Sequence, residues 1–359
     1  MASHHDSGGT AAKCIVDSHI HLFPASHMPR LNWTGDLPAD HRLNRQYSLD
    51  EYRAATQSQS KELRGFVFLE TDRISGLKDT QWQDALEEVD FLVRIAQGNP
   101  REGEGHRPED ARLVLGIVPW APVPAGAESV ARYVGHAQER AGEAWPLIKG
   151  FRYLVQDKPA GVMLQEKFIE GLRWLGEHGL TFDLGPDARS GGLHQLQEAC
   201  AMMERLYAGG NGPRIIINHF CKPNLRLSAQ EAPANRDFTQ WKDCIEQMAR
   251  HPSTYIKLSG LFSELPEQDE AHPTDVAALV ERTKPWVDVV FHSFGPSRIM
   301  FGSDWPVCNV GGPGIVKSWS HWHDFVEAIL ASQNSTAEEQ AQIWSGTAVK
   351  AYGITLPVS

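Results

Sequence analysis

A series of eight short apolar runs most constrains what this chain of 359 residues can fold into. Each run is nearly continuous rather than alternating, which is typical of strands buried on both faces of a parallel sheet. The segments between the runs carry apolar residues at helical spacing, as at Leu86, Val89 and Val93. Eight strands that alternate with helices predict an α/β fold, and the chain length favours a single-domain (β/α)8 TIM barrel. The runs cover residues 14–16, 65–69, 113–118, 147–154, 180–184, 214–218, 254–258 and 298–302.

Local signals place the borders of the predicted barrel. Ser48 and Glu51 have the spacing of a capping box and predict the start of a helix. We expect a flexible N-terminal segment at residues 1–12 and the barrel at residues 13–359. A doubly wound open sheet is the alternative fold, and it predicts a glycine fingerprint after the first strand. The sequence reads DSHIH there, at residues 17–21, which favours the barrel.

The charge balance and the cysteines limit the classes of partner. Lys and Arg total 34 against 45 Asp and Glu, a net charge of -11, and no basic run is present. Nucleic acids and anionic membranes are therefore unexpected partners. No apolar stretch approaches the roughly 18 residues that span a bilayer, and residues 1–10 lack the apolar core of a signal peptide. Five scattered cysteines without a C-x-x-C motif indicate reduced thiols. We expect a cytoplasmic protein.

Polar residues stand at or near the end of each predicted strand. In a TIM barrel the carboxyl ends of the strands meet on one face, where the active sites of such enzymes lie. A barrel with a purely structural role has less reason to collect so many ionisable groups there. The sequence therefore predicts a convergent polar site. In chain order its candidates are His19, His21, Glu70, Trp120, Arg152, Gln156, Asp183, Asn218, His219, Lys257, Ser259 and Asp304.

The motif His-x-His occurs twice, and its position distinguishes the two copies. With 16 histidines in 359 residues, roughly one such pair is expected by chance. On a strand, residues i and i+2 point to the same side, so His19 and His21 can face one target together. His321 and His323 lie in a helical pattern, where i and i+2 do not face each other. We interpret the second pair as surface or packing residues.

Four further candidates each have a structural alternative. His219 ends an apolar run and is either a functional residue or a satisfied core histidine. Asp304 could be a helix N-cap, but the proline and glycines that follow it delay the next helix. Arg152 inside a buried strand needs a polar or anionic partner. Glu70 faces the same requirement, which a pairing with Arg73 or Arg152 would satisfy without any role in catalysis.

Taken together, these motifs resemble the amidohydrolase superfamily, whose signature is His-x-His on strand 1, a later strand-end His and an Asp on strand 8. More narrowly, five segments resemble its sugar-acid lactonase branch, which includes L-fuconolactonases and L-rhamnono-1,4-lactonases. The most specific of the five is FGSDWP. The segments are VDSHIH at 16–21, GFRYL at 150–154, INHFCKP at 217–223, KLSGL at 257–261 and FGSDWP at 301–306.

The resemblance implies an enzyme that hydrolyses an aldonolactone, a small-molecule substrate, to the aldonate in sugar catabolism. The segment ETDR at residues 70–73 is similar to the rhamnonolactonases, which favours L-rhamnono-1,4-lactone and thus L-rhamnose catabolism. L-Fuconolactone or another lactone is the alternative, and a homodimer is the expected assembly. Other chemistries of the superfamily also stay open: a metal-dependent amidase or deaminase, or a decarboxylase of aromatic acids. A non-enzymatic barrel is disfavoured because the four motif residues are all present.

The resemblance also implies roles for the site residues. Asp304 would be the general base and would later return its proton to the leaving alkoxide. Three histidines would stabilise the oxyanion, directly or through a metal. Five residues would bind the sugar, two of them by stacking their rings on it. The histidines are His19, His21 and His219; the sugar-binding residues are Arg152, Gln156, Glu70 and the two stacking residues Trp120 and Trp305.

The metal requirement has two interpretations. Many metal-dependent amidohydrolases have a histidine at the end of strand 5, and this chain reads TFDLG at residues 181–185. We therefore expect that no cofactor is strictly required. The alternative is one divalent metal, Zn2+, since a catalytic zinc needs three protein ligands and a water. In that case His19, His21 and Asp304 would hold the ion, with Glu70 or His219 as the fourth ligand.

Overall fold

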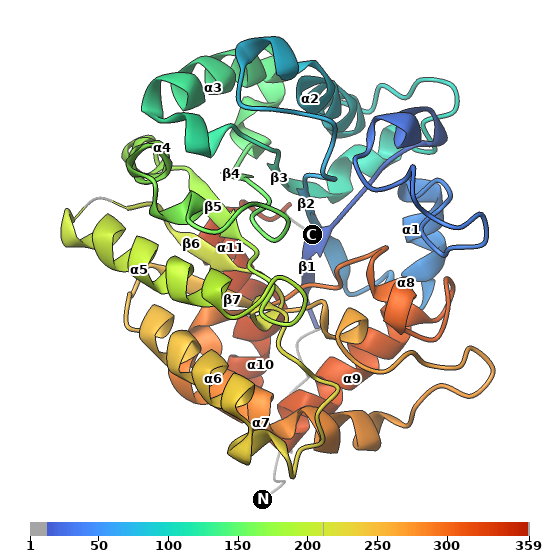
Figure 1. The fold of residues 1–359 in the computed structure, drawn as a ribbon. Coiled ribbons are helices and arrows are strands. Elements are labelled where there is room, and N and C mark those ends of the chain that lie inside the picture. The colour runs from blue at the N-terminus through green and yellow to red at the C-terminus, as the bar shows by residue number, and fades with distance from the viewer. Residues whose placement is uncertain (1–12, 211, 358–359) are drawn as a thin grey trace, which may run out of the picture.

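The computed structural model describes residues 13–210 and 212–357, and the predicted N-terminal segment 1–12 lies outside these residues. Eight parallel strands stand at the centre, and helices surround them (Figure 1). Each of the eight apolar runs overlaps one strand, which confirms the predicted (β/α)8 barrel. The strands are β1 Ile15–Ile20, β2 Leu63–Leu69, β3 Val114–Val118, β4 Gly150–Arg152, β5 Thr181–Leu184, β6 Ile215–Ile217, β7 Thr254–Leu258 and β8 Ile299–Phe301.

The strands pair in chain order and close on themselves. Regular pairing joins the strands in two groups, one in the order β1, β2, β3 and the other in the order β4, β5, β6, β7, β8. An isolated bridge between Ile117 and Ile148 links β3 to the chain entering β4. At the other seam, the backbone N–H of His21 donates to Trp305 O at 2.7 Å, and that of Asp304 donates to His19 O at 2.9 Å. These hydrogen bonds place the end of β8 beside the end of β1. The first and last strands of the barrel therefore contribute to one site.

The helices form the outer layer, and their starts follow local signals. Glu51 accepts a hydrogen bond from the backbone N–H of Ser48 at 2.8 Å, which confirms the helix start predicted there. Among the described residues, no helix is both long and apolar enough to cross a bilayer. The helices are α1 Leu49–Ala55, α2 Gln83–Ala96, α3 Ala127–Ala141, α4 Glu166–Glu177, α5 His194–Ala208, α6 Arg236–Ala249, α7 Val276–Phe294, α8 Cys308–Gly311, α9 Ser318–Ser332, α10 Ala337–Ala341 and α11 Thr347–Tyr352.

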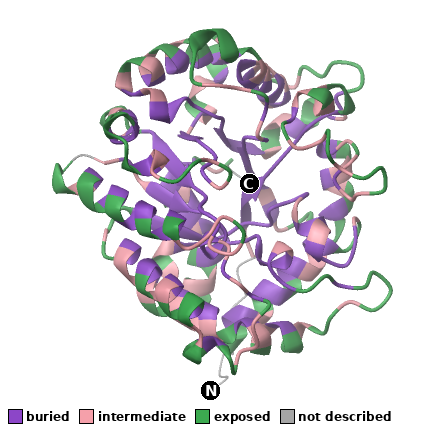
Figure 2. Cartoon of the chain, in the orientation of Figure 1, coloured by how far each residue is buried: buried purple, intermediate pink, exposed green. Residues whose placement is uncertain are grey.

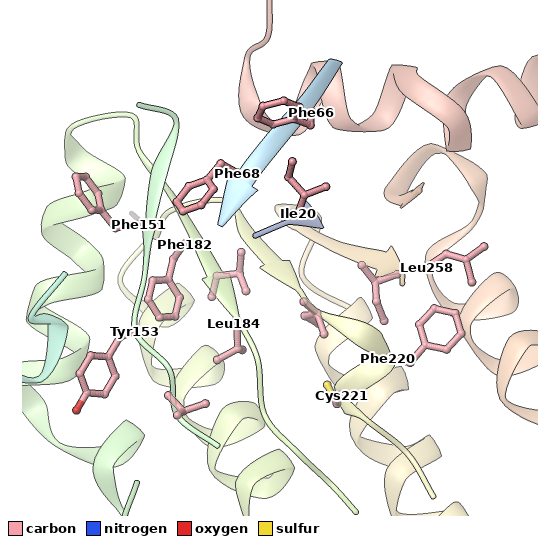
Figure 3. Close-up of a cluster of buried hydrophobic side chains, with 14 of the residues drawn as sticks. Ile20, Phe66, Phe68, Phe151, Tyr153, Phe182, Leu184, Phe220, Cys221 and Leu258 are labelled. Carbon is pink, nitrogen blue, oxygen red and sulfur yellow. The ribbon is translucent and has the colours of Figure 1, made fainter. Parts of the chain in front are cut away.

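Apolar side chains pack on both sides of the strands. The strands are buried, whereas the outer faces of the helices are exposed (Figure 2). The larger cluster lies between strands and helices, where Phe182 of β5 packs edge-to-face against Phe168 of α4; Figure 3 shows Phe182 in this layer. The smaller cluster joins strand residues such as Val16 and Met300 to Tyr352 of α11. Thus α11 covers the end of the barrel away from the polar strand ends.

Candidate active site

Three histidines converge on one carboxylate at the polar end of the barrel. The Nε2 atom of His19 lies 3.4 Å from Oδ1 of Asp304, that of His21 lies 3.5 Å away and that of His219 lies 3.6 Å away. His19 and His21 are also in contact, with their Nε2 atoms 3.1 Å apart. All four residues are buried. The structure therefore brings the four predicted catalytic residues together.

Unusual backbone conformation sets the direction of two of these side chains. Asp304 has φ 58°, and the four residues 219–222 have φ between 47° and 60°. A non-glycine residue in this left-handed region costs roughly 1–2 kcal/mol, and such strain collects where function requires it. The strained turn is held from outside because Trp241 donates its indole N–H to Phe220 O at 2.7 Å. This turn directs His219 and Lys222 into the site.

His219 depends on a close approach of the next strand end. Its Nδ1 lies 2.8 Å from Oγ of Ser259. Gly260 follows with φ +66°, and a Cβ atom there would lie 2.3 Å from Nδ1 of His219. Only glycine fits both the backbone angle and the space. The segment KLSGL therefore positions His219 from β7.

A buried carboxylate fixes the loop that carries Asp304. Asp17 accepts hydrogen bonds from the backbone N–H of Ser303 at 2.8 Å and from its hydroxyl at 2.7 Å. It also accepts from Tyr52 and Trp319, each at 2.9 Å. Burial raises the pKa of Asp17, and these hydrogen bonds oppose the rise. Asp17 is thus a structural residue of the DSHIH motif rather than a member of the site.

Burial keeps two of the imidazoles, those of His19 and His219, neutral while Asp304 stays ionised. Burial, and then the charge of Lys257, lowers the pKa of His19 well below its usual value. Burial also lowers the pKa of His219 to about 3, although Asp304 opposes this. Burial raises the pKa of Asp304, but His219 and His21 outweigh this effect and leave the pKa lowered. At neutral pH the site therefore holds an anionic base beside two neutral rings, those of His19 and His219.

A cavity of about 210 Å³ opens above the four residues. Six of the predicted site residues line it, while His19 lies deeper and is fully buried. Further lining residues come from the loops after β1, β2, β4, β6 and β8. The predicted lining residues are His21, Glu70, Arg152, Gln156, His219 and Asp304; the others include Phe23, Trp33, Leu43, Asp72, Lys222 and Val307.

One wall of the cavity is polar and carries charge. Nη1 of Arg152 lies 3.5 Å from Oε1 of Glu70, whereas Arg73 pairs with Glu88 at 3.2 Å. The structure thus decides between the two partners considered for Glu70. Burial raises the pKa of Glu70 to about 8, although Arg152 opposes the rise.

The structure adds a lysine to this wall that the sequence analysis did not assign. Lys222 donates to Oε1 of Gln156 at 3.2 Å. Lys222 belongs to the segment INHFCKP, which the sequence analysis identified. The left-handed turn that directs its side chain into the cavity could not be predicted from that segment. The apolar wall formed by Phe23, Trp33 and Leu43 had no signal, because its loop has no periodic pattern.

Comparison with known proteins places the chain in a family. The profile of the family described as amidohydrolase matches residues 16–354. The chain belongs to the amidohydrolase family. It is 35% identical to an L-rhamnono-gamma-lactonase of Scheffersomyces stipitis over 95% of this chain and 98% of that protein. It is 28% identical to an L-fucono-1,5-lactonase of Burkholderia multivorans over 69% of this chain and 74% of that protein. These similarities place this amidohydrolase in the sugar-acid lactonase branch.

A solved structure supports the fold of this amidohydrolase. An amidohydrolase from Burkholderia multivorans, solved with bound zinc, superimposes with a TM-score of 0.69 at 24% identity. The alignment covers 95% of this chain and all of that one. At this identity the likeness concerns the barrel alone.

The two tryptophans predicted to stack on the sugar do not line the cavity of this amidohydrolase, which corrects that expectation. Trp305 is only 1% exposed, and its ring packs edge-on against Tyr47 and Tyr52, with ring centroids 5.2 Å away from each. Trp120 is 6% exposed and packs in the same way against Tyr133 at 5.2 Å. Both side chains turn toward the helices, so they stabilise the core rather than face the cavity.

The second His-x-His pair of this amidohydrolase lies on α9, as predicted. His321 stacks on Phe262 with centroids 5.7 Å apart, and His323 stacks on Trp319 at 5.9 Å. His323 also contacts Nζ of Lys13 at 2.8 Å. The two rings have separate neighbours and meet no common target, so they pack rather than catalyse.

The site offers a group of residues that could hold a metal, but one contact does not match such a site. His19, His219 and Asp304 each place a ligand atom within 4.8 Å of the others. Of the two predicted fourth ligands, His219 belongs to this group, whereas Glu70 accepts from the backbone N–H of Asp72 at 2.5 Å. A ligating histidine normally donates its second ring N–H to an acceptor. The second nitrogen of His19, Nδ1, faces the amino group of Lys257 at 3.2 Å instead.

Proposed function

We propose that this amidohydrolase hydrolyses aldonolactones to aldonates, with L-rhamnono-1,4-lactone as its substrate in L-rhamnose catabolism. The observation that carries the proposal is the ionised Asp304 in contact with three imidazoles below a polar-walled cavity. Its 35% identity to an L-rhamnono-gamma-lactonase supports the choice of substrate. L-Fuconolactone is the nearest alternative, supported by the more distant L-fucono-1,5-lactonases.

Lactone hydrolysis needs a base, an oxyanion site and an acid, and four residues supply them. Asp304 takes a proton from water, whose oxygen bonds to the carbonyl carbon. Ring N–H groups of His19 and His219 donate to the carbonyl oxygen as its negative charge develops, and His21 helps to orient His19. The bond from the carbonyl carbon to the ring oxygen then breaks, and Asp304 returns its proton to that oxygen. The product is one aldonate with a free hydroxyl.

The cavity fits one sugar ring and offers donors to its oxygens. Its volume of about 210 Å³ is below the roughly 300–1,000 Å³ of sites for larger ligands. Arg152 presents a rigid fork of N–H donors, and Lys222 with Gln156 supplies a second polar group beside it. Glu70 can accept from a sugar hydroxyl. We therefore assign these four residues to substrate binding.

We infer that the reaction requires no metal. Nε2 of His19 could bind zinc only if it carried no proton. The contact of Lys257 with the other ring nitrogen, Nδ1, favours a proton on Nε2. A zinc ion, if bound, would be held by His19, His219 and Asp304 and would polarise the carbonyl. A lactone is an activated ester, so hydrogen bonding from the rings suffices for its oxyanion.

Two wider expectations accompany the catalytic proposal. We propose that residues 13–359 form one catalytic domain, because the family match covers residues 16–354 without a break. We also propose a cytoplasmic enzyme that works as a homodimer. The five cysteines are all free, which agrees with a reducing compartment.

A hydrolysis screen across aldonolactones with a pH indicator tests the function. The panel contains L-rhamnono-1,4-lactone, L-fuconolactone, other aldonolactones, an unsubstituted lactone, an amide and an aromatic carboxylic acid. We expect acid release that is fastest with L-rhamnono-1,4-lactone. Release of carbon dioxide from the aromatic acid, or turnover of amides without turnover of any lactone, would contradict the proposal.

A further inference from the structure

Lys257 is a wholly buried lysine inside the barrel, one layer below the site. It points inward from β7, and its side chain is 0% exposed. Its Nζ lies 2.6 Å from Oδ1 of Asp183 on β5 and 3.2 Å from Nδ1 of His19 on β1. No step of the lactonase mechanism above uses this lysine directly. A buried charge is expensive unless it is paired, so its position needs an explanation.

The partner of Lys257 is held in place from the closed end of the barrel. Asp183 accepts from the hydroxyl of Tyr352 on α11, with both carboxylate oxygens 2.9 Å away. A carboxylate with a hydroxyl on one side and an amino group at 2.6 Å on the other forms an ion pair with an ammonium group. An ammonium group has three N–H donors and no acceptor. Its contact with Nδ1 of His19 is therefore a hydrogen bond that His19 accepts.

This contact decides where the single proton of neutral His19 lies. Because Nδ1 accepts, the proton is on Nε2, which lies 3.1 Å from Nε2 of His21 and 3.4 Å from Oδ1 of Asp304. His21 carries its proton on the other ring nitrogen, because its Nδ1 lies 3.0 Å from the carbonyl oxygens of Leu69 and Glu70. Two carbonyls can only accept, so Nδ1 of His21 carries the proton. The donors then run in one direction, from Lys257 through His19 and His21 to the backbone.

We propose that Lys257 is a positioning residue that keeps His19 in its Nε2–H tautomer, so that His19 offers the site a donor rather than a metal ligand. The catalytic part of this inference rests on the lactonase function proposed above. The tautomer itself does not. A neutral His19 can bind zinc through Nε2 only if its proton moves to Nδ1, where the ammonium of Lys257 stands. Lys257 thus favours hydrogen-bond catalysis and opposes metal binding at the same time.

The alternative is that Lys257 and Asp183 form a structural pair with no effect on His19. The variant K257M alone would leave Asp183 buried and unpaired and could unfold the protein. The double variant K257M/D183N removes both charges and keeps an acceptor for Tyr352. The variant Y352F is the matched control, because it removes one hydrogen bond of the same buried group but leaves Lys257 in contact with His19. Thermal melts identify the variants that fold.

The test reads the tautomer directly from the 15N chemical shifts of histidine-labelled protein at neutral pH, with His19 assigned by comparison with H19Q. We expect the wild type and Y352F to show a protonated Nε2 and an unprotonated Nδ1 for His19. In K257M/D183N the proton should redistribute between the two nitrogens. A protonated Nδ1 in the wild type, or an unchanged Nε2–H form in the double variant, would overturn the proposal.

Zinc titration by calorimetry and steady-state kinetics give two further readouts. Zinc should bind K257M/D183N at least about tenfold more tightly than it binds the wild type, which is the low end of effects from groups that orient a ligating histidine. Equal zinc affinity would count against the proposal. With lactone, kcat should fall while KM changes little, because His19 does not line the cavity. The shifts and the zinc titration need no substrate, so a failure of the lactonase assignment would leave them unaffected.

Discussion

Arg152 and Glu70 face each other on one wall of the cavity, with Nη1 of the arginine 3.5 Å from Oε1 of the glutamate. Within the described part of the chain, that Oε1 and the Nε of Arg152 are both buried without a hydrogen-bond partner. Buried polar atoms are normally satisfied by protein, water or ligand. We therefore expect the hydroxyls of a bound sugar to complete the hydrogen bonding of this pair.

Replacing Arg152 should affect hydroxylated substrates selectively. In Arg152→Met we expect KM for L-rhamnono-1,4-lactone to rise about tenfold or more, since a hydrogen bond to a charged group contributes roughly 1.5–3 kcal/mol. KM for an unsubstituted lactone should change much less. Initial-rate measurements with both substrates check this. Equal losses for the two lactones would mean that Arg152 acts on the reacting carbonyl or on folding.

The carboxylate of Asp304 should be essential for turnover but not for the fold. Asp304→Asn keeps the shape of the side chain and cannot accept a proton. We expect kcat to fall by more than the roughly 10²–10⁴ typical of general base catalysis, because the same group also serves the leaving alkoxide. Stopped-flow or long-time assays measure the rate, and circular dichroism checks the fold. A kcat near that of the wild type would show that Asp304 only caps the loop.

The two His-x-His pairs should respond differently to alanine. His19→Ala and His21→Ala should each lower kcat severely, because both rings contact Asp304. His321→Ala should leave activity unchanged. His323→Ala should also leave kcat unchanged but lower the free energy of unfolding by about 1–3 kcal/mol, because His323 is buried on Trp319. Comparable losses of kcat in both pairs would show that the active site is not where we place it.

Removing metal should leave most of the activity. After exhaustive chelation we expect kcat for the lactone to stay within about twofold of the untreated enzyme, since the rings and Asp304 carry the chemistry in this proposal. Added zinc should give no stimulation. Metal analysis of the treated protein is the control for complete removal. Activity that disappears on chelation and returns with one equivalent of metal would reassign His19, His219 and Asp304 as ligands.

The pKa of Glu70, raised to about 8 by burial, predicts a pH dependence of stability. A carboxyl whose pKa is higher in the folded than in the unfolded state favours folding while it is protonated. Its contribution is complete below the unfolded value near 4.5 and is lost as the pH rises through about 8. Urea unfolding at pH 5 and pH 8.5 should therefore show a decrease with pH that Glu70→Gln reduces by a few kcal/mol. An identical decrease in both proteins would place the titration elsewhere.

The pattern of residues along the chain was enough to predict the barrel and the centre of the site. Eight apolar runs predict eight strands, because a strand buried on both faces has no solvent-facing side and its residues are therefore nearly all apolar. The parallel order then brings the strand ends to one face, so His19, His21, His219 and Asp304 had to lie near one another once the barrel closed. Both inferences are independent of the contacts between individual side chains.

The pairings and directions of the side chains within that site follow from contacts in the folded barrel. Glu70 pairs with Arg152 rather than with its sequence neighbour Arg73, because the parallel strands bring β4 within reach of the end of β2. Lys222 reaches the cavity through a left-handed turn that its residue types do not predict. The contact of Lys257 with His19 joins residues 238 positions apart. Such contacts depend on the rotation of each side chain inside the closed barrel, which spacing along the chain does not encode.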